Sequence, residues 1–110
     1  SRVPGRLKAA AQLPSLDEEL LLRAEAALTG DNPRRAARLL DAAEIQATPR
    51  WLLLRGKACM ALGEYADAVS WLKSAEGTYP EQVIPRLELC YRELKDYQNA
   101  YFYACKQRKI

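Results

Sequence analysis

The sequence predicts an all-α fold, a stack of three helix-turn-helix repeats preceded by a short N-terminal extension. The first observation is a 32-residue step: the tetrapeptide LLLR at residues 20–23 recurs at 52–55, and a weaker version follows at 84–87. The second is the spacing of the apolar residues, which recur every three or four positions and do not alternate as in a strand. A period of this length is typical of stacked helical units. Small residues keep the same register in all three units: Ala36, Ala68 and Ala100.

The first repeat carries clear signals for the ends of its two helices. Ser15 and Glu18 form a capping box that opens a helix over residues 15–29. Gly30 ends this helix, and Asn32 with Pro33 starts the next one, over 33–46, as N-cap and first helical residue. The acidic run at 17–19 suits the positive end of a helix dipole, which we prefer to a catalytic pair.

The second and third repeats are divided in the same way. Thr48 and Pro49 start a helix over 49–62, Gly63 stops it, and a helix over 66–76 follows. Residues 77–80 separate the third unit, with helices over 82–94 and 97–109, where Pro85 is tolerable only in the first turn. We therefore expect an extension at 1–14 and one domain at 15–110, with repeats at about 17–48, 49–80 and 81–110.

Composition narrows the function classes. Apolar residues make up 49% and charged residues 28%, and no segment approaches the ~20 apolar residues that span a bilayer. The net charge is +3, and the basic residues are scattered apart from Arg34, Arg35 and Arg38 and the tail at 106–109. Aromatic platforms in a basic groove are missing, so a nucleic-acid-binding domain is a remote alternative.

The cysteines and the lack of histidine argue against an enzyme. Cys59, Cys90 and Cys105 form no C-x-x-C pair, which indicates neither a zinc site nor a disulfide framework. They fit small core residues in a reducing compartment, cytoplasmic or nuclear. With no histidine, the chain lacks the commonest general base and metal ligand. We expect no enzymatic activity, no metal and no cofactor.

The second unit, residues 49–80, resembles the tetratricopeptide repeat, a helix pair that stacks into a right-handed superhelix. The residues that carry the resemblance are Gly56, Gly63, Tyr65, Ala68, Leu72, Ala75 and Pro80. The departures are Leu52 and Cys59 in place of aromatics and Arg55 in place of leucine. The other units match less well, through Ala24, Ala36, Leu40 and Ala43 in the first and Leu87, Tyr91, Tyr97 and Ala100 in the third. The resemblance covers residues 17 to about 107 and implies a right-handed α-solenoid.

This resemblance implies a concave groove, lined by the first helix of each pair, that binds an amphipathic helix or peptide of a protein partner. The chain would then be an adaptor or scaffold. The implied groove positions are Glu18, Leu21, Glu25 and Leu28 in the first unit, Arg50, Leu53, Lys57 and Met60 in the second, and Gln82, Pro85, Arg86, Leu89 and Arg92 in the third. An equally open interpretation is that Leu21, Leu53 and Leu89 are core residues packing on the extension.

Two subclasses of this family differ in how well they fit. Members that clamp the C-terminal carboxylate of heat-shock chaperones need lysines and asparagines in the groove. Only Arg86 fits among the corresponding residues, which are Leu21, Glu25, Leu54, Gln82 and Arg86. Residues 78–80 and 85–92, and the spacing from Arg55 to 63–65, are similar to the small chaperones that hold the needle subunit of type III secretion systems. A dedicated secretion chaperone is therefore the alternative function.

Aromatic residues are concentrated in the last predicted helix. Tyr101, Phe102 and Cys105 are expected to face outward, because no capping helix follows them. They predict either a contact surface for a homo- or hetero-oligomer or the point at which a longer repeat array has been cut. Trp51 and Trp71 lie on different helices and are interpreted as packing residues, not as a recognition cage.

Overall fold

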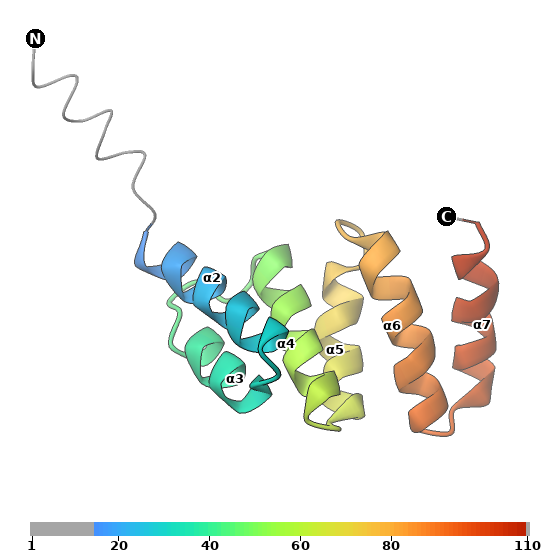
Figure 1. The fold of residues 1–110 in the computed structure, drawn as a ribbon. Helices are drawn as coiled ribbons and strands as arrows, with labels where there is room; N and C mark the ends of the chain where they lie inside the picture. Colours follow the sequence, from blue (N-terminus) through green and yellow to red (C-terminus); the bar gives the residue numbers. More distant parts are fainter. Residues whose placement is uncertain (1–14, 110) are drawn as a thin grey trace, which may run out of the picture.

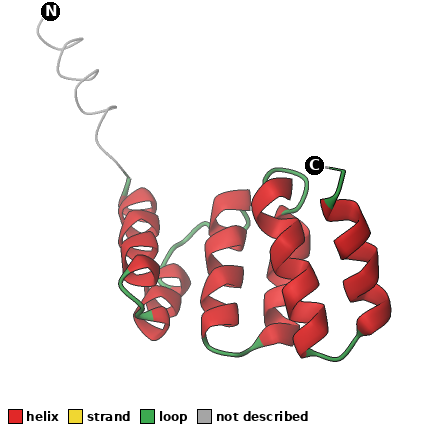
Figure 2. Cartoon of the chain, turned by 45° about the vertical axis from the view of Figure 1, so that its right-hand side comes forward, coloured by secondary structure: helices red, strands yellow, loops and turns green. Residues whose placement is uncertain are grey.

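The computed structural model describes residues 15–109, and within them the chain is all-helical, as predicted, with no strand (Figure 2). The predicted extension at residues 1–14 lies outside the described residues. The helices of the described part are α2 (Leu16–Thr29), α3 (Pro33–Asp41), α4 (Pro49–Ala61), α5 (Tyr65–Ala75), α6 (Pro80–Glu93) and α7 (Tyr97–Gln107).

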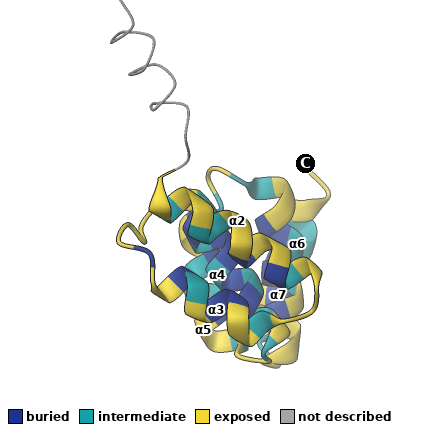
Figure 3. Ribbon diagram, turned by 60° about the vertical axis from the view of Figure 1, so that its left-hand side comes forward, coloured by how far each residue is buried: buried dark blue, intermediate teal, exposed yellow. Residues whose placement is uncertain are grey.

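The helices form a row of antiparallel pairs, α2 with α3, α4 with α5 and α6 with α7 (Figure 1). Each helix packs against its neighbours in sequence, and α2 also packs against α4. The buried residues lie between these helices, and the exposed ones lie on the outward faces (Figure 3). Helices α2, α4 and α6 are the first helices of the three pairs.

Side chains cap the helices where the sequence predicted it. The hydroxyl of Ser15 accepts from the Glu18 backbone N–H at 3.1 Å, and the Thr48 hydroxyl accepts from the N–H of Trp51 at 3.3 Å. Asn32 caps α3 in the same way through its side-chain oxygen. These bonds satisfy backbone donors that have no partner inside the helix, and they fix where each helix begins.

The turn inside each helix pair has the same backbone conformation. Asp31, Gly63 and Lys95 are the residues with positive φ in the range 15–109, at 58°, 78° and 61°. Their spacing of 32 residues equals the step of the sequence repeat. Glycine adopts this left-handed conformation freely and aspartate tolerates it, whereas a lysine pays a steric penalty. The 32-residue repeat is therefore present in the backbone conformation of the turns as well as in the sequence.

Two predicted boundaries are wrong for local reasons. Helix α3 ends at Asp41 instead of near residue 46, because the Asp17 carboxylate accepts the backbone N–H groups of Glu44 and Ile45 at 3.0 and 2.8 Å. Those bonds hold residues 44 and 45 as a loop. Helix α6 begins at Pro80, so Pro85 stands in the second turn and not in the first. The carbonyl of Glu81, which loses its helical donor, is on an exposed residue where water can replace it.

The core consists of two clusters that meet at α4. Trp51 is 1% exposed, donates its indole N–H to the carbonyl of Leu40 at 2.8 Å, and contacts Trp71 edge to face with ring centroids 5.3 Å apart. The predicted packing role of Trp51 is thus confirmed. Gly56 lets α4 approach α5 closely, since a Cβ there would lie 2.6 Å from Leu72. Cys59 and Cys90 are buried core residues, while Cys105 is half-buried.

Candidate partner-binding surface

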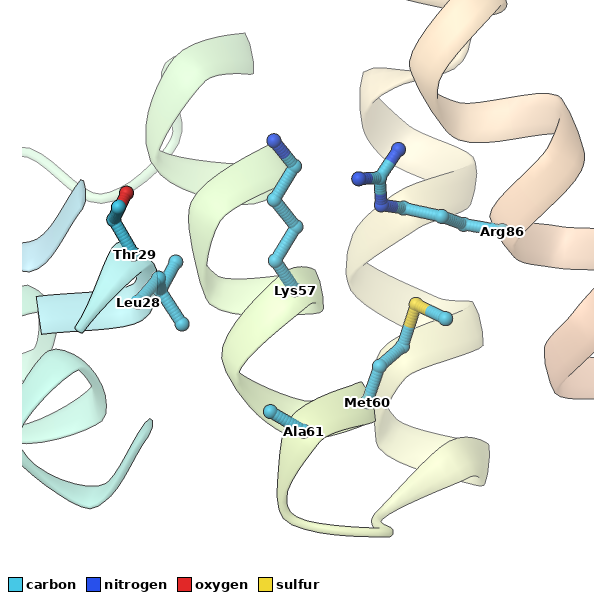
Figure 4. Close-up of a pocket in the computed structure, with 6 residues that line it drawn as sticks. All are labelled: Leu28, Thr29, Lys57, Met60, Ala61 and Arg86. Atoms are coloured by element: carbon cyan, nitrogen blue, oxygen red, sulfur yellow. The ribbon is translucent and has the colours of Figure 1, made fainter. Parts of the chain in front are cut away.

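Four of the predicted groove residues meet at one open hollow, although they come from three helices. Its volume is about 420 Å³. Helix α2 contributes Leu28 and Thr29, α4 contributes Lys57, Met60 and Ala61, and α6 contributes Arg86 (Figure 4). This position between the first helices of the pairs is the one that the family resemblance implies for the groove.

Polar contacts join the three helices along the same surface. Arg50 of α4 pairs with Glu25 of α2 at 3.0 Å. Lys57 of α4 donates to the side-chain oxygen of Gln82 at 2.8 Å, and Arg86 donates to the backbone carbonyl of Gln82, also at 2.8 Å. These bonds bridge α2 to α4 and α4 to α6, so they hold the walls of the hollow in place.

The hollow contains two positively charged side chains, Lys57 and Arg86, which are partly shielded from water. Burial lowers the pKa of Lys57 below its ordinary value, the nearby Arg86 lowers it further, and Glu25 partly opposes both effects. Burial also lowers the pKa of Arg86. Both shifts mean that the surrounding protein disfavours the charged forms of these two side chains.

Leu89 and Arg92, the other predicted residues of the third unit, line a second hollow of about 480 Å³ together with Tyr65 and Glu93. Leu89 is 40% exposed, and Arg92 pairs with Glu88 at 3.6 Å one turn earlier on α6. Tyr65 entered the sequence analysis as part of the repeat pattern and not as a surface residue. Its place at the start of α5, directly after the turn at Gly63, is the signal that could have found it.

Leu53 belongs to the core. It is 4% exposed and packs in the cluster formed by α4, α5, α6 and α7, so we do not retain it among the binding residues. The alternative interpretation placed it against the extension, which lies outside the described residues. Leu21 is half-buried against the cluster of α2, α3 and α4. The side chain of Leu53 points between its own helix pair and the next one, and a repeat pattern alone does not separate that direction from the groove side.

The last described helix, α7, has an exposed aromatic face. Tyr101 and Phe102 are 73% and 55% exposed. Phe102 and Cys105 line a hollow of about 310 Å³ with Lys106 and Lys109. At the 32-residue step, Tyr101 takes the position of Ala37 and Val69, which are covered by the helix pairs that follow them.

Tyr103 turns inward from the same helix. It is 6% exposed and stacks on Tyr91 with ring centroids 5.7 Å apart. Burial, together with the carboxylate of Glu76, raises the pKa of Tyr103 to about 12. Lys106 pairs with Glu76 and lies over the Tyr103 ring at 5.5 Å. The aromatic residues of α7 therefore divide into a buried anchor and an exposed face.

Between residues 15 and 109 no cluster of acidic, cysteine and histidine side chains is arranged to hold a metal ion. The longest helices of that range have 14 residues and none could cross a membrane. Comparison of the chain with models of protein families, with curated proteins and with solved structures finds no match in any of the three.

Proposed function

We propose that the chain is a protein-binding module, a right-handed solenoid of three tetratricopeptide-like helix pairs that binds a partner's helix or peptide across α2, α4 and α6. The observation that carries the proposal is the hollow where Leu28, Lys57, Met60 and Arg86 meet from three different helices. A solenoid brings corresponding residues of successive units onto one surface, and such surfaces bind extended partners. The positive-φ turns at 31, 63 and 95 support the same architecture.

The chemistry of the hollow fits a helix or peptide better than a small molecule. It is open to solvent and combines apolar side chains, Leu28 and Met60, with polar ends of Lys57 and Arg86. Peptides in grooves are recognised through apolar anchors at helical spacing with polar contacts around them. An adaptor or scaffold role follows from this mode of binding.

The test is capture of partners from a lysate of the native host by the immobilised protein, followed by mass spectrometry. The Met60→Glu variant places a charge among the anchors, and Ala61→Arg fills the hollow from an exposed position. A matched control is Ile45→Glu, because Ile45 is 63% exposed and lies away from the hollow. We expect the partner to be lost from both groove variants and kept by the control, with unchanged helical circular dichroism. A partner retained by all three variants would contradict the proposal.

The alternative function, a chaperone that holds one aggregation-prone client, is favoured by the exposed Tyr101 and Phe102 of α7. An uncovered aromatic face promotes self-association. A chaperone should then be dimeric or aggregated alone and monodisperse with its client, whereas an adaptor should be a stable monomer. Sedimentation velocity with and without the captured partner distinguishes the two, and Tyr101→Ser with Phe102→Ser should abolish any self-association through this face.

A further inference from the structure

Two cations face the same hollow without a carboxylate partner. The ion pairs of residues 15–109 are Glu25 with Arg50, Asp41 with Arg55, Glu88 with Arg92 and Glu76 with Lys106. Lys57 and Arg86 are in none of them and instead donate to the two neutral oxygens of Gln82. An ionised carboxylate is a stronger acceptor than an amide or carbonyl oxygen. The hollow thus holds two donors that form no ion pair with a carboxylate of residues 15–109.

The two side chains come from different helices and reach into the same space. Figure 4 shows the Arg86 side chain extending from α6 toward α4, the Lys57 side chain running upward along α4 on the other side of the opening, and Met60 below them. Burial lowers the pKa of Lys57 most, and the like charge of Arg86 lowers it further. An anion bound between the two cations would offset both effects. Glu25, the acidic group that acts on Lys57, is already paired with Arg50.

The surroundings select the kind of anion. Leu28, Met60 and Ala61 lie beside the cations, so the ligand should carry apolar groups next to its charge. A nucleic-acid strand has a charge at every phosphate and would meet the carboxylates of Glu25 and Glu93 on the same surface. An aspartate or glutamate on an amphipathic segment, one helical turn from an apolar residue, satisfies both requirements.

We propose that the hollow between Lys57 and Arg86 binds an aspartate or glutamate side chain of an amphipathic partner segment, whose apolar neighbour packs on Leu28 and Met60. The inference rests on the proposed function and names the class of partner: an acidic amphipathic helix or peptide that crosses α2, α4 and α6. The bound carboxylate belongs to a side chain within the segment. Lys57 and Arg86 recognise this carboxylate by its charge, while Leu28 and Met60 contact the apolar face of the segment.

The experiment selects ligands from a random 12-residue peptide library displayed on phage, with the folded chain as the target. We expect selected peptides to combine an acidic residue with an apolar one three or four positions away. The best peptide is then synthesised with its acidic residue intact or changed to the amide. In fluorescence anisotropy titrations, the amide peptide should bind with a dissociation constant roughly tenfold or more above that of the acidic peptide. The K57Q/R86Q variant of the protein should raise the dissociation constant of the acidic peptide by a similar factor.

A double-mutant cycle gives the decisive comparison. The K57Q/R86Q variant should bind the acid and amide peptides equally, while R34Q/R38Q, which removes two exposed charges from α3, should discriminate between them like the unaltered chain. Circular dichroism confirms that each variant is folded. Selected peptides that perturb the Met60 methyl resonance but tolerate the amide would overturn the acidic subsite alone. Selection of no peptide, or of peptides that leave Met60 unperturbed, would overturn both this inference and the proposed function.

Discussion

Gly56→Ala tests whether the close contact between α4 and α5 determines the packing of the central helix pair. A Cβ at this position would lie 2.6 Å from both Cγ and Cδ2 of Leu72, well inside the usual van der Waals distance. Leu72 is 0% exposed, and Cγ is the branch point of its side chain, so rotation of the terminal methyl groups cannot relieve the overlap. Either the side chain must leave its rotamer or α4 must move away from α5.

The magnitude follows from two opposing terms. Overpacking a filled core costs about 1–3 kcal/mol, while alanine in place of glycine inside a helix contributes about 1 kcal/mol in the stabilising direction. Because the overlap involves the branch carbon of a fully buried side chain, the overpacking cost lies in the upper part of that range, about 2–3 kcal/mol, and we expect a net loss of about 1–2 kcal/mol in the free energy of unfolding. For a chain of this length, each kcal/mol lost lowers the Tm by roughly 4–8 °C.

Urea unfolding followed by circular dichroism measures the change. Gly77→Ala is the matched control, because no atom lies within 4 Å of a Cβ at Gly77 and its φ is not positive. The control should be neutral or slightly stabilising through its effect on the unfolded chain. A Gly56→Ala protein as stable as the unaltered chain would show that α4 and α5 can separate freely, and it would refute the packing argument.

Three further predictions concern stability. Asp17→Ala removes both hydrogen bonds from the carboxylate to the loop, so the free energy of unfolding should fall by about 1–3 kcal/mol. The backbone amides of Glu44 and Ile45 should then exchange their hydrogens faster in NMR measurements, and an unchanged exchange rate would contradict the anchoring role of Asp17. Lys95→Gly relieves the positive φ of 61° and should stabilise the chain by about 1 kcal/mol in urea titrations, whereas a loss would show that the lysine is not strained. Burial raises the pKa of Cys90 to about 11, so between pH 9 and pH 11 the folded chain keeps the thiol proton that the unfolded chain loses. The free energy of unfolding should therefore fall by roughly 1.4 kcal/mol per pH unit over this range. Urea titrations of the Cys90→Ala variant should show a smaller dependence on pH.

Local signals in the sequence were sufficient to predict most of the helices. Ser15, Asn32 and Thr48 are capping residues whose bonds reach only three positions along the chain, so their roles follow from neighbouring letters. The early end of α3 was not predictable in this way. It depends on Asp17, which is separated by 27 residues from the first amide that it binds.

The candidate site was predicted in part, for a related reason. The family resemblance implied that Leu28, Lys57, Met60 and Arg86 face a common groove, and these four residues line one hollow. The direction of Leu53 depends on how α4 rotates between its neighbours, which the repeat does not specify. Likewise, Lys57 and Arg86 are in none of the ion pairs of residues 15–109, and this depends on how three helices pack together and could not be derived from any one of them.

Helix α4 takes part in both hydrophobic clusters, and this has a consequence for how the chain opens. Trp51, Leu54 and Ala58 face the cluster with α2 and α3, while Leu53 and Cys59 face the cluster with α5, α6 and α7. Melting of α4 would expose both clusters at once, so its amides should exchange only through global unfolding. The short α3 and the loop after it can unfold locally, with a lower free energy of opening than that of global unfolding. A bound partner is therefore expected to slow hydrogen exchange chiefly in the first helix pair, where it would suppress this local unfolding.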